Sequence, residues 1–223
     1  YMLQFNGTAG VWRKETIEDA GGWQDDTLTE DLDLSMRAQL KGWKIVYLEE
    51  VGSPAELPAE MNGFKSQQYR WMKGGAETAR KMLPAIWKAS IPLRQKLHAT
   101  LHLLGSTVFV FVFMLGVLSV PLLLALRELN LDARIFSGFI IGTLSIAVVY
   151  FIGNVTNPNT NPNRRFLRDL LKFLFMFPLF LAMSMGLSFH NTIAVVQGYL
   201  GKRSAFVRTP KYAIRNLTDT IKS

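Results

Sequence analysis

The sequence contains no cysteine among its 223 residues, which excludes disulfide bonds and thiolate metal sites. Charged residues are also scarce, at 19%, and they are unevenly distributed. Three stretches contain no Asp, Glu, Lys or Arg: 97–126, 135–163 and 173–201. Each is longer than the roughly 18 apolar residues of a candidate membrane span. The chain is therefore neither a purely soluble domain nor a disordered tail, and we predict that it contacts a lipid bilayer.

An initiating methionine and a recognisable signal peptide are also missing. The chain begins at Tyr1, within what reads as folded sequence, so we expect a fragment of a longer protein. The polar part has no run of basic residues with interleaved aromatic residues, which argues against nucleic acid as a partner. The net charge of +8 therefore needs another explanation.

The charge changes sign along the chain. Residues 1–60 carry 5 Lys and Arg against 12 Asp and Glu, whereas 61–96 carry 8 against 1 and 97–223 carry 12 against 4. Basic residues beside a membrane span favour the cytoplasmic side and anionic lipid headgroups. We therefore expect an integral membrane protein of an inner, plasma or Golgi-type membrane, with its polar part in the cytoplasm.

Residues 1–60 alternate strand-like and helical stretches, and this order predicts α/β architecture. Strands are expected at 3–5, 11–13 and 43–48, the last of them buried. Helices are expected at 16–20 and at 29–40, where Thr29 is a natural N-cap. In the longer helix a buried stripe should repeat every four residues, at Leu32, Met36 and Leu40.

Residues 61–90 have the pattern of a basic amphipathic helix with Trp and Phe on its apolar face. This composition is typical of a helix that lies at a membrane surface. The alternative is an ordinary surface helix packed on its own domain. We expect Pro84 and Pro92 to bend or end it.

We predict that 97–126 and 135–153 span the membrane, with 127–134 outside and Arg164, Arg165 and Arg168 in the cytoplasm. A third full span would leave the basic residues after 201 outside. We therefore expect 166–200 to enter from the cytoplasmic side and return, or to lie obliquely at the interface. Polar and helix-breaking residues give it a place to bend, at Pro178, Gly186 and 188–192. A straight third span is the alternative.

Two groups of residues could carry chemistry. Thr29, Glu30 and Asp31 begin a helix, and Asp33 extends the acidic cluster. Carboxylates at this position are often only partners of the helix dipole. A sugar-transfer step, however, needs one carboxylate to take the proton from the attacking hydroxyl. The pattern leaves both interpretations open.

The second group is Gln67-Gln68-Tyr69-Arg70-Trp71. The Arg70 guanidinium offers paired donors that fit phosphate oxygens, and Trp71 offers a flat apolar face for a sugar ring. Alternatively, Trp71 anchors the helix in the bilayer interface and Arg70 contacts lipid phosphate. His98 and His102 are four residues apart, a possible metal pair in principle, but their position at the start of a span is more typical of interfacial residues.

These two groups resemble the TED and Q(Q/R)xRW motifs of processive family 2 membrane glycosyltransferases of the cellulose synthase superfamily. The blocks 5–13, 20–23, 30–34 and 41–44 look most like its mannan and glucomannan synthase branch. Near the end, Phe206-Val207-Arg208-Thr209-Pro210-Lys211 resembles the FxVTxK gating-loop motif and keeps its Phe, Thr and Lys, although Arg replaces its Val.

The resemblance implies an inverting hexosyltransferase that adds sugars from GDP-mannose or UDP-glucose to a growing β-linked polysaccharide and extrudes the product. It implies Asp31 as the general base. Donor-diphosphate ligands would be Gln67, Arg70, Thr209 and Lys211. Residues that bind the acceptor would be Trp71, Glu30, Gly7 and Thr8, with a dipole partner as the other interpretation of Glu30.

The implied fold is the C-terminal part of a GT-A-like α/β domain, followed by interfacial and transmembrane α-helices. Its boundaries would be 1–60 for the acceptor side of the catalytic domain, 61–96 for the interfacial helices, and 97–223 for the membrane helices and gating-loop-like segment. The family also implies Mg²⁺ or Mn²⁺, for which this chain shows no recognisable ligand. The alternatives are a non-processive family 2 enzyme acting on a lipid-linked acceptor and a transporter or channel subunit without chemistry.

Overall fold

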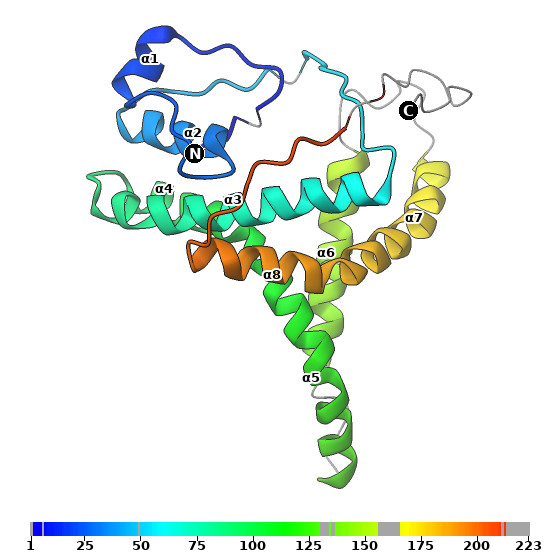
Figure 1. Cartoon of the computed structure of the whole chain (residues 1–223). Coiled ribbons are helices and arrows are strands. Elements are labelled where there is room, and N and C mark those ends of the chain that lie inside the picture. The colour runs from blue at the N-terminus through cyan, green and yellow to red at the C-terminus, as the bar shows by residue number, and fades with distance from the viewer. Residues whose placement is uncertain are drawn as a thin grey trace. The chain divides into compact units, whose positions relative to one another are not determined.

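The computed structural model describes residues 2–5, 7–48, 50–129, 134, 137–155, 166–210 and 212. Its helices are α1 (Lys14–Asp19), α2 (Glu30–Leu40), α3 (Met61–Lys88), α4 (Leu93–Leu103), the 3₁₀ turn η1 (Leu104–Thr107), α5 (Val108–Glu128), α6 (Ser137–Val155), α7 (Phe166–Gly186) and α8 (Ser188–Tyr199) (Figure 1). The chain forms two compact units. The first contains Tyr1–Tyr47, Ser53–Phe111 and Ser188–Ser223, and the second contains Leu48–Gly52 and Val112–Leu187.

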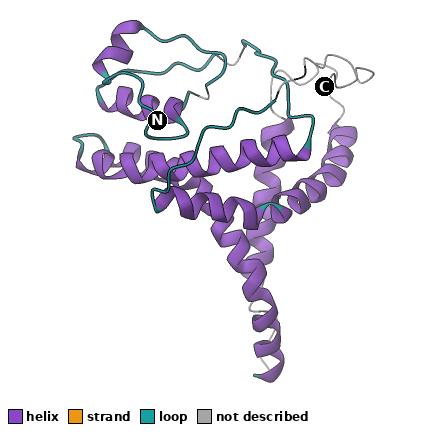
Figure 2. Ribbon diagram, viewed as in Figure 1, coloured by secondary structure: helices purple, strands orange, loops and turns teal. Residues whose placement is uncertain are grey.

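None of the described residues forms a β-strand, so the three strands predicted within 1–60 are not observed (Figure 2). A strand exists only beside another strand, because its backbone N–H and C=O groups bond to that neighbour. The segment 43–48, predicted to be a buried strand, is instead exposed at Val46 and Tyr47. The described residues are helical or irregular, and they do not confirm the α/β class.

The first predicted strand, 3–5, bonds to helix side chains instead. The Leu3 amide donates to Gln39 Oε1 at 2.8 Å, and the Gln39 amide group donates back to the Leu3 carbonyl at 2.7 Å. The Phe5 amide donates to Ser35 Oγ at 3.0 Å. Side chains of α2 thus satisfy backbone groups that a neighbouring strand would otherwise bond.

Both helices predicted within 1–60 are present, α1 starting at Lys14 and α2 at Glu30. Thr29 is the N-cap of α2, as predicted, but its side chain makes no capping bond. Its hydroxyl pairs with Thr78 Oγ1 at 3.1 Å instead, so this residue joins two helices. Of the predicted buried stripe, Leu32 and Met36 are buried, and Leu40 is partly buried against the same core.

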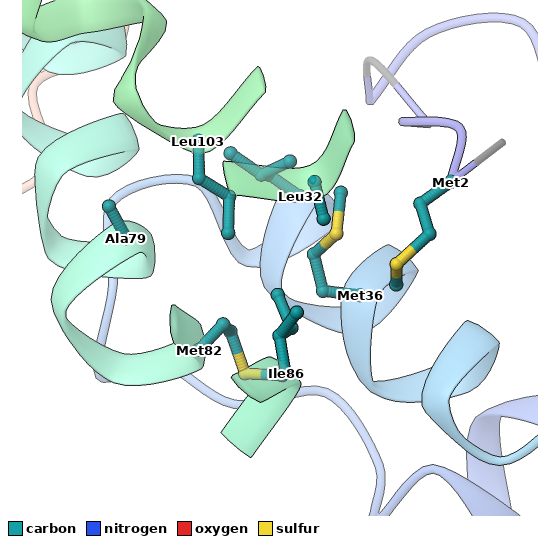
Figure 3. Close-up of a cluster of buried hydrophobic side chains, with 8 residues drawn as sticks. Met2, Leu32, Met36, Ala79, Met82, Ile86 and Leu103 are labelled. Atoms are coloured by element: carbon teal, nitrogen blue, oxygen red, sulfur yellow. The ribbon is translucent and has the colours of Figure 1, made fainter. Parts of the chain in front are cut away.

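A hydrophobic core joins α2, α3 and α4 (Figure 3). Its buried side chains come from all three helices and from the N-terminal segment: Met2, Leu32, Met36, Ala79, Met82, Ile86, Ala99 and Leu103. Full burial of a large aliphatic side chain contributes about 1.5–3 kcal/mol. Because this core includes both α2 and α3, it fixes the helix that begins at Glu30 relative to the helix that carries Arg70.

Helix α3 covers most of the predicted range 61–90 and passes through Pro84 without ending. It ends at Lys88, and Pro92 becomes the N-cap of α4. Its apolar residues Ala79, Met82 and Ile86 pack inside the protein, whereas Trp71 and Trp87 are about half exposed. That it also lies at a membrane surface stays a prediction.

Helix α8 lies along α3 in the first unit (Figure 1). Gly198 allows the close approach: a Cβ at this position would lie 2.5 Å from the Lys73 carbonyl oxygen and 2.8 Å from Ala76 Cβ. Two further bonds join α8 to η1 and the start of α5: Thr192 Oγ1 donates to the Phe109 carbonyl at 3.0 Å, and the Tyr199 and Thr107 hydroxyls pair at 2.7 Å.

The predicted first span, 97–126, falls within a helical run, Leu93–Glu128, that is long and apolar enough to cross a membrane. In the second unit, α6 and α7 pack through aromatic rings, with Phe151 and Phe173 centroids 5.3 Å apart. The apolar stretch described in α6, Leu144–Asn154, is shorter than a span. The predicted span 135–153 therefore stays a prediction, and Arg164 and Arg165 lie outside the described residues.

The predicted bend in 166–200 is observed next to Gly186. Helices α7 and α8 are separated at Leu187, where the helix axis turns by 51°. Pro178 lies inside α7, which continues beyond it. The bent pair fits either a broken span or a re-entrant segment.

Candidate functional site

Asp31 lies in the first turn of α2, and its two carboxylate oxygens have different surroundings. Oδ1 accepts a hydrogen bond from the Leu32 amide at 2.8 Å. Oδ2 lies beside Gly7, where an added Cβ would be 2.9 Å from it. One oxygen thus satisfies a free amide at the helix N-terminus. The other faces the 7–10 turn and is the oxygen that could accept a proton.

The turn that approaches Asp31 depends on glycine. Gly7 has a φ of +69°, and Ala9 has a φ of +55°. A positive φ costs a residue with a Cβ about 1–2 kcal/mol of conformational free energy, and it does not cost glycine this energy. The turn is exposed at Gly7 and Thr8. The structure therefore brings the predicted acceptor-side residue Gly7 to Asp31, with Thr8 following it in the open turn.

Burial raises the pKa of Asp31 above its ordinary value of 3.8. The hydrogen bond from the Leu32 amide opposes this rise, the negative charge of Glu30 adds to it, and the positive charge of Arg70 opposes it more weakly. The side chain is therefore a stronger base than a free aspartate. Arg70 also lies within electrostatic reach of Asp31, which brings the two predicted groups of residues together.

The segment before Asp31 is held on α3 by side chains from one stretch of that helix. The Leu28 amide donates to Glu77 Oε2 at 2.8 Å, and the Thr29 hydroxyl pairs with Thr78. Gly74 faces Thr29 so closely that an added Cβ would lie 2.8 Å from the Thr29 backbone nitrogen. The position of Asp31 therefore depends on residues 74–78 of α3.

Arg70 contacts the segment that follows α8. Its Nη1 donates to the Val207 carbonyl at 2.9 Å, and its guanidinium carbon lies 4.5 Å from the centroid of the Phe206 ring, a cation–π distance. Gln67 and Arg70 are both partly buried, one turn apart on α3, whereas Trp71 is 46% exposed. The predicted donor ligands Gln67 and Arg70 thus share a side of α3.

Residues 204–209 run along α3 towards its N-terminus (Figure 1). Ser204 contacts Lys73, Val207 contacts Arg70, and Thr209 lies beside Gly63. The Thr209 hydroxyl is buried and has no hydrogen-bond partner among the described residues. Phe206 and Thr209 therefore lie against α3. Lys211 lies outside the described residues.

A cavity of about 320 Å³ opens between α3, the start of α8 and the 204–207 segment. Its polar lining comes from Ser66, Tyr69, Arg70, His190 and Ser204. Tyr69 and His190 hold α3 to α8, since their rings are 5.6 Å apart and His190 Nε2 lies 3.1 Å from the Lys65 carbonyl. The cavity offers one cation, three hydroxyl groups and one imidazole to a polar ligand.

Asp33, which the sequence groups with Asp31, has a different environment. It is fully buried, its Oδ2 accepts a bond from Arg37 Nε at 2.8 Å, and Lys81 Nζ lies 3.0 Å from its Oδ1. Arg37 Nη2 also donates a hydrogen bond to the Gly22 carbonyl at 2.9 Å. Asp33 therefore stabilises the packing of α2, and its carboxylate is not directed at the 7–10 turn.

The described residues do not fit a divalent metal ion. No three His, Asp or Glu side chains among them lie close enough together to hold one. The rings of His98 and His102 are stacked, with centroids 6.5 Å apart, and His102 Nε2 lies 2.7 Å from Gln4 Oε1. We therefore assign no metal ligand in this part of the chain and derive no step through a metal.

Sequence reasoning missed Lys73 and Glu77. Their spacing on a basic helix is also that of an ordinary surface ion pair, yet the Lys73 side chain is fully buried and Glu77 is 8% exposed. The signal that could have found them is the adjacent run Gly74-Gly75-Ala76, since small residues in a helix allow close packing on that side. His190 lies in the 188–192 stretch, to which the sequence assigns only a bend, yet it lines the cavity.

A comparison with known families and proteins adds to this geometry. The family model described as glycosyl transferase family group 2 matches residues 2–200. Glucomannan 4-beta-mannosyltransferase 1 of Oryza sativa subsp. japonica is 50% identical over 95 residues, which cover 42% of this chain and 18% of that protein. Probable glucomannan 4-beta-mannosyltransferase 3 of Arabidopsis thaliana is 34% identical over 225 aligned positions, 98% of this chain and 36% of that protein.

The chain thus spans about a third or less of the length of these relatives. No solved structure matches it. The family match covers most of the chain and includes both groups of residues that the fold brings together. The chain therefore belongs to the group 2 family of glycosyl transferases.

Proposed function

We propose that this chain is part of a membrane-embedded, inverting glycosyltransferase that adds sugars from a nucleotide sugar to a growing β-linked polysaccharide and extrudes the product. One observation carries the proposal: a half-buried carboxylate of raised pKa, Asp31, lies within electrostatic reach of Arg70. A base and a cation are the two groups that a single-displacement sugar transfer from a diphosphate requires. The relatives' names, which specify a glucomannan 4-beta-mannosyltransferase, support the same reaction class.

In the proposed reaction Asp31 Oδ2 takes the proton from an acceptor hydroxyl. The oxygen of that hydroxyl forms a bond to the anomeric carbon of the donor sugar. The bond between this carbon and the diphosphate oxygen breaks, and its electron pair leaves with the nucleotide diphosphate. Attack from the face opposite the leaving group inverts the anomeric configuration, and Asp31 later returns the proton to water.

The other predicted residues take roles around this step. Gln67, Arg70, Thr209 and Lys211 bind the donor diphosphate, and Trp71, Glu30, Gly7 and Thr8 bind the acceptor. Arg70 already contacts Phe206 and Val207, so the donor would meet Arg70 together with this segment. Residues 1–60 would complete a GT-A-like α/β domain with the rest of the whole protein, which would also hold Mg²⁺ or Mn²⁺.

The donor is proposed to be GDP-mannose, with UDP-glucose as the second candidate. The full-length protein in membranes should incorporate radiolabelled mannose from GDP-mannose into an ethanol-insoluble polymer, and less glucose from UDP-glucose. The names of the relatives favour this order. Absence of polymer from either donor, with protein shown to be folded, would contradict the proposal.

Arg70→Ala should weaken donor binding as well as turnover. The variant loses the paired donors for a phosphate, and a hydrogen bond to a charged group contributes about 1.5–3 kcal/mol, which corresponds to roughly a 10- to 150-fold weaker nucleotide affinity. Equilibrium titration with the nucleotide diphosphate measures this loss. Arg70→Lys should recover only part of it, because lysine keeps the charge and loses the planar fork.

The matched control is Lys65→Ala, which removes an exposed basic side chain from the same helix. It should bind nucleotide with an affinity within about twofold of wild type, since exposed charges contribute little. Equal losses in Arg70→Ala and Lys65→Ala would show a general effect of charge rather than a diphosphate contact.

We propose that the first unit faces the cytoplasm. The chain has no native cysteine, so a single cysteine can report sidedness. In a full-length protein otherwise free of cysteine, Ala205→Cys should react with a membrane-impermeant maleimide only from the cytoplasmic side. Leu129→Cys, at an exposed position in the predicted outer loop, should react only from the opposite side. Labelling of the Ala205→Cys variant from the outer face alone would exclude the assignment of 206–211 as a nucleotide-facing loop.

A further inference from the structure

Lys73 is a fully buried charged residue whose role the proposed reaction does not explain. Its Nζ donates to Ser204 Oγ at 2.8 Å and lies 3.9 Å from Glu77 Oε1. Burial of an ammonium group is costly unless partners compensate for its lost hydration. The ammonium therefore ties α3 to the residue that lies two positions before Phe206.

Glu77, one turn along α3, makes the corresponding contact to the other side of the site. Its Oε2 accepts from the Leu28 amide at 2.8 Å, and its Oε1 is the oxygen nearest to the Lys73 ammonium. Leu28 lies three residues before Asp31. A single buried ion pair thus contacts both the segment that leads to the general base and the segment that covers Arg70.

We propose that Lys73 and Glu77 are positioning residues that hold these two segments on one turn of α3. Lys73 acts through Ser204 and sets the place of Phe206 and Val207 over Arg70, so it governs donor binding. Glu77 acts through the Leu28 amide and sets the place of Asp31, so it governs proton transfer. This inference rests on the proposed function for its kinetic consequences, but the contacts themselves are independent of it.

The two residues should therefore affect different kinetic parameters in the full-length protein. Lys73→Met keeps the side-chain length and removes the ammonium, and Ser204→Ala removes only its hydroxyl partner. Each should raise the KM for the nucleotide sugar about tenfold, the size expected for one hydrogen bond to a charged group, with kcat changed less than about threefold. Glu77→Ala should instead lower kcat about tenfold and leave the donor KM within about threefold.

Loss of one member leaves the other charge buried without its partner, and such a variant can unfold. The double variant Lys73→Met/Glu77→Gln removes both charges and keeps an oxygen that can accept from the Leu28 amide. It should regain the thermal stability lost in Lys73→Met and retain the raised KM. The control is Lys88→Met, an exposed lysine at the end of the same helix, which should leave KM, kcat and stability unchanged.

Hydrogen exchange gives a readout that needs no activity. Lys73→Met/Glu77→Gln and Ser204→Ala should speed amide exchange about tenfold in peptides that cover 202–208, and Glu77→Ala should do so in peptides that cover 27–32. Wild-type exchange in these peptides, or a donor KM that returns to wild type in the folded double variant, would overturn the positioning role. If the wild-type protein transferred no sugar, the proposed function would be wrong. The hydrogen-exchange rates would still test whether Lys73 and Glu77 position the two segments.

Discussion

Asp31→Asn is expected to abolish polymer synthesis while the protein still folds and binds nucleotide. Asparagine keeps the shape of the side chain and an oxygen for the Leu32 amide, but it cannot take a proton from the acceptor. Loss of a positioned base typically lowers the rate by about 10²–10⁴. Polymer synthesis from the nucleotide sugar measures the loss, and equilibrium nucleotide binding should be unchanged because Arg70 and Gln67 are intact.

The same variant should be at least as heat-stable as the wild type at neutral pH. Burial raises the pKa of Asp31 in the folded protein, so the folded state binds its proton more tightly than the unfolded state. Stability from this group is present below the ordinary pKa of 3.8 and is lost as the pH rises through the higher folded value. At neutral pH the ionised side chain therefore costs stability, and removal of its charge relieves that cost.

The matched control is Asp25→Asn, which removes an exposed carboxylate from the same acidic region and should retain full activity.

The rate of polymer synthesis by the wild-type protein should also fall as the pH is lowered, with a midpoint above 3.8, and Asp31→Asn should lack this pH dependence. A folded Asp31→Asn protein that polymerises at near the wild-type rate would remove Asp31 from the mechanism and leave it as a partner of the helix dipole.

Gly74→Ala is expected to inactivate the protein, although Gly74 itself is not one of the residues proposed to bind the donor or the acceptor. The new Cβ would lie 2.6 Å from Thr29 Cγ2 and 2.8 Å from the Thr29 backbone nitrogen, so the start of α2 would have to move. Overpacking of this kind typically costs about 1–3 kcal/mol. Because Asp31 lies in the first turn of α2, the same movement displaces its carboxylate. We expect kcat to fall at least about tenfold, as measured in the polymer assay.

Gly75→Ala is the control at the next position of the same helix. Its Cβ would lie 3.4 Å from Ser106 Oγ and 3.5 Å from Ser106 Cβ, an ordinary contact distance. Alanine also favours a helix over glycine by about 1 kcal/mol, so this variant should be as stable as wild type or more stable. Equal activity in the two variants would show that Gly74 does not position Asp31.

The sequence alone determined helices α1, α2 and α3 and the family. Residues 29–40 and 61–90 have helical spacing of apolar side chains. This spacing follows from local helix geometry, so it can be recognised without knowing the rest of the fold. The motifs were recognisable for a similar reason, since residue types at fixed short spacings can be read directly. The strands could not be predicted in this way, because a strand requires a partner that local sequence does not specify.

Only the tertiary structure decided which acidic and basic residues face the candidate site. Asp31 and Asp33 are two positions apart in sequence, yet one faces the Gly7 turn and the other is paired with Arg37 and Lys81. Lys73 has the spacing of a surface lysine, yet α8 and Ser204 bury it against α3. The physical reason is that desolvation and pairing depend on what packs against a side chain, and a deciding neighbour can lie far along the chain, as Ser204 lies 131 residues from Lys73.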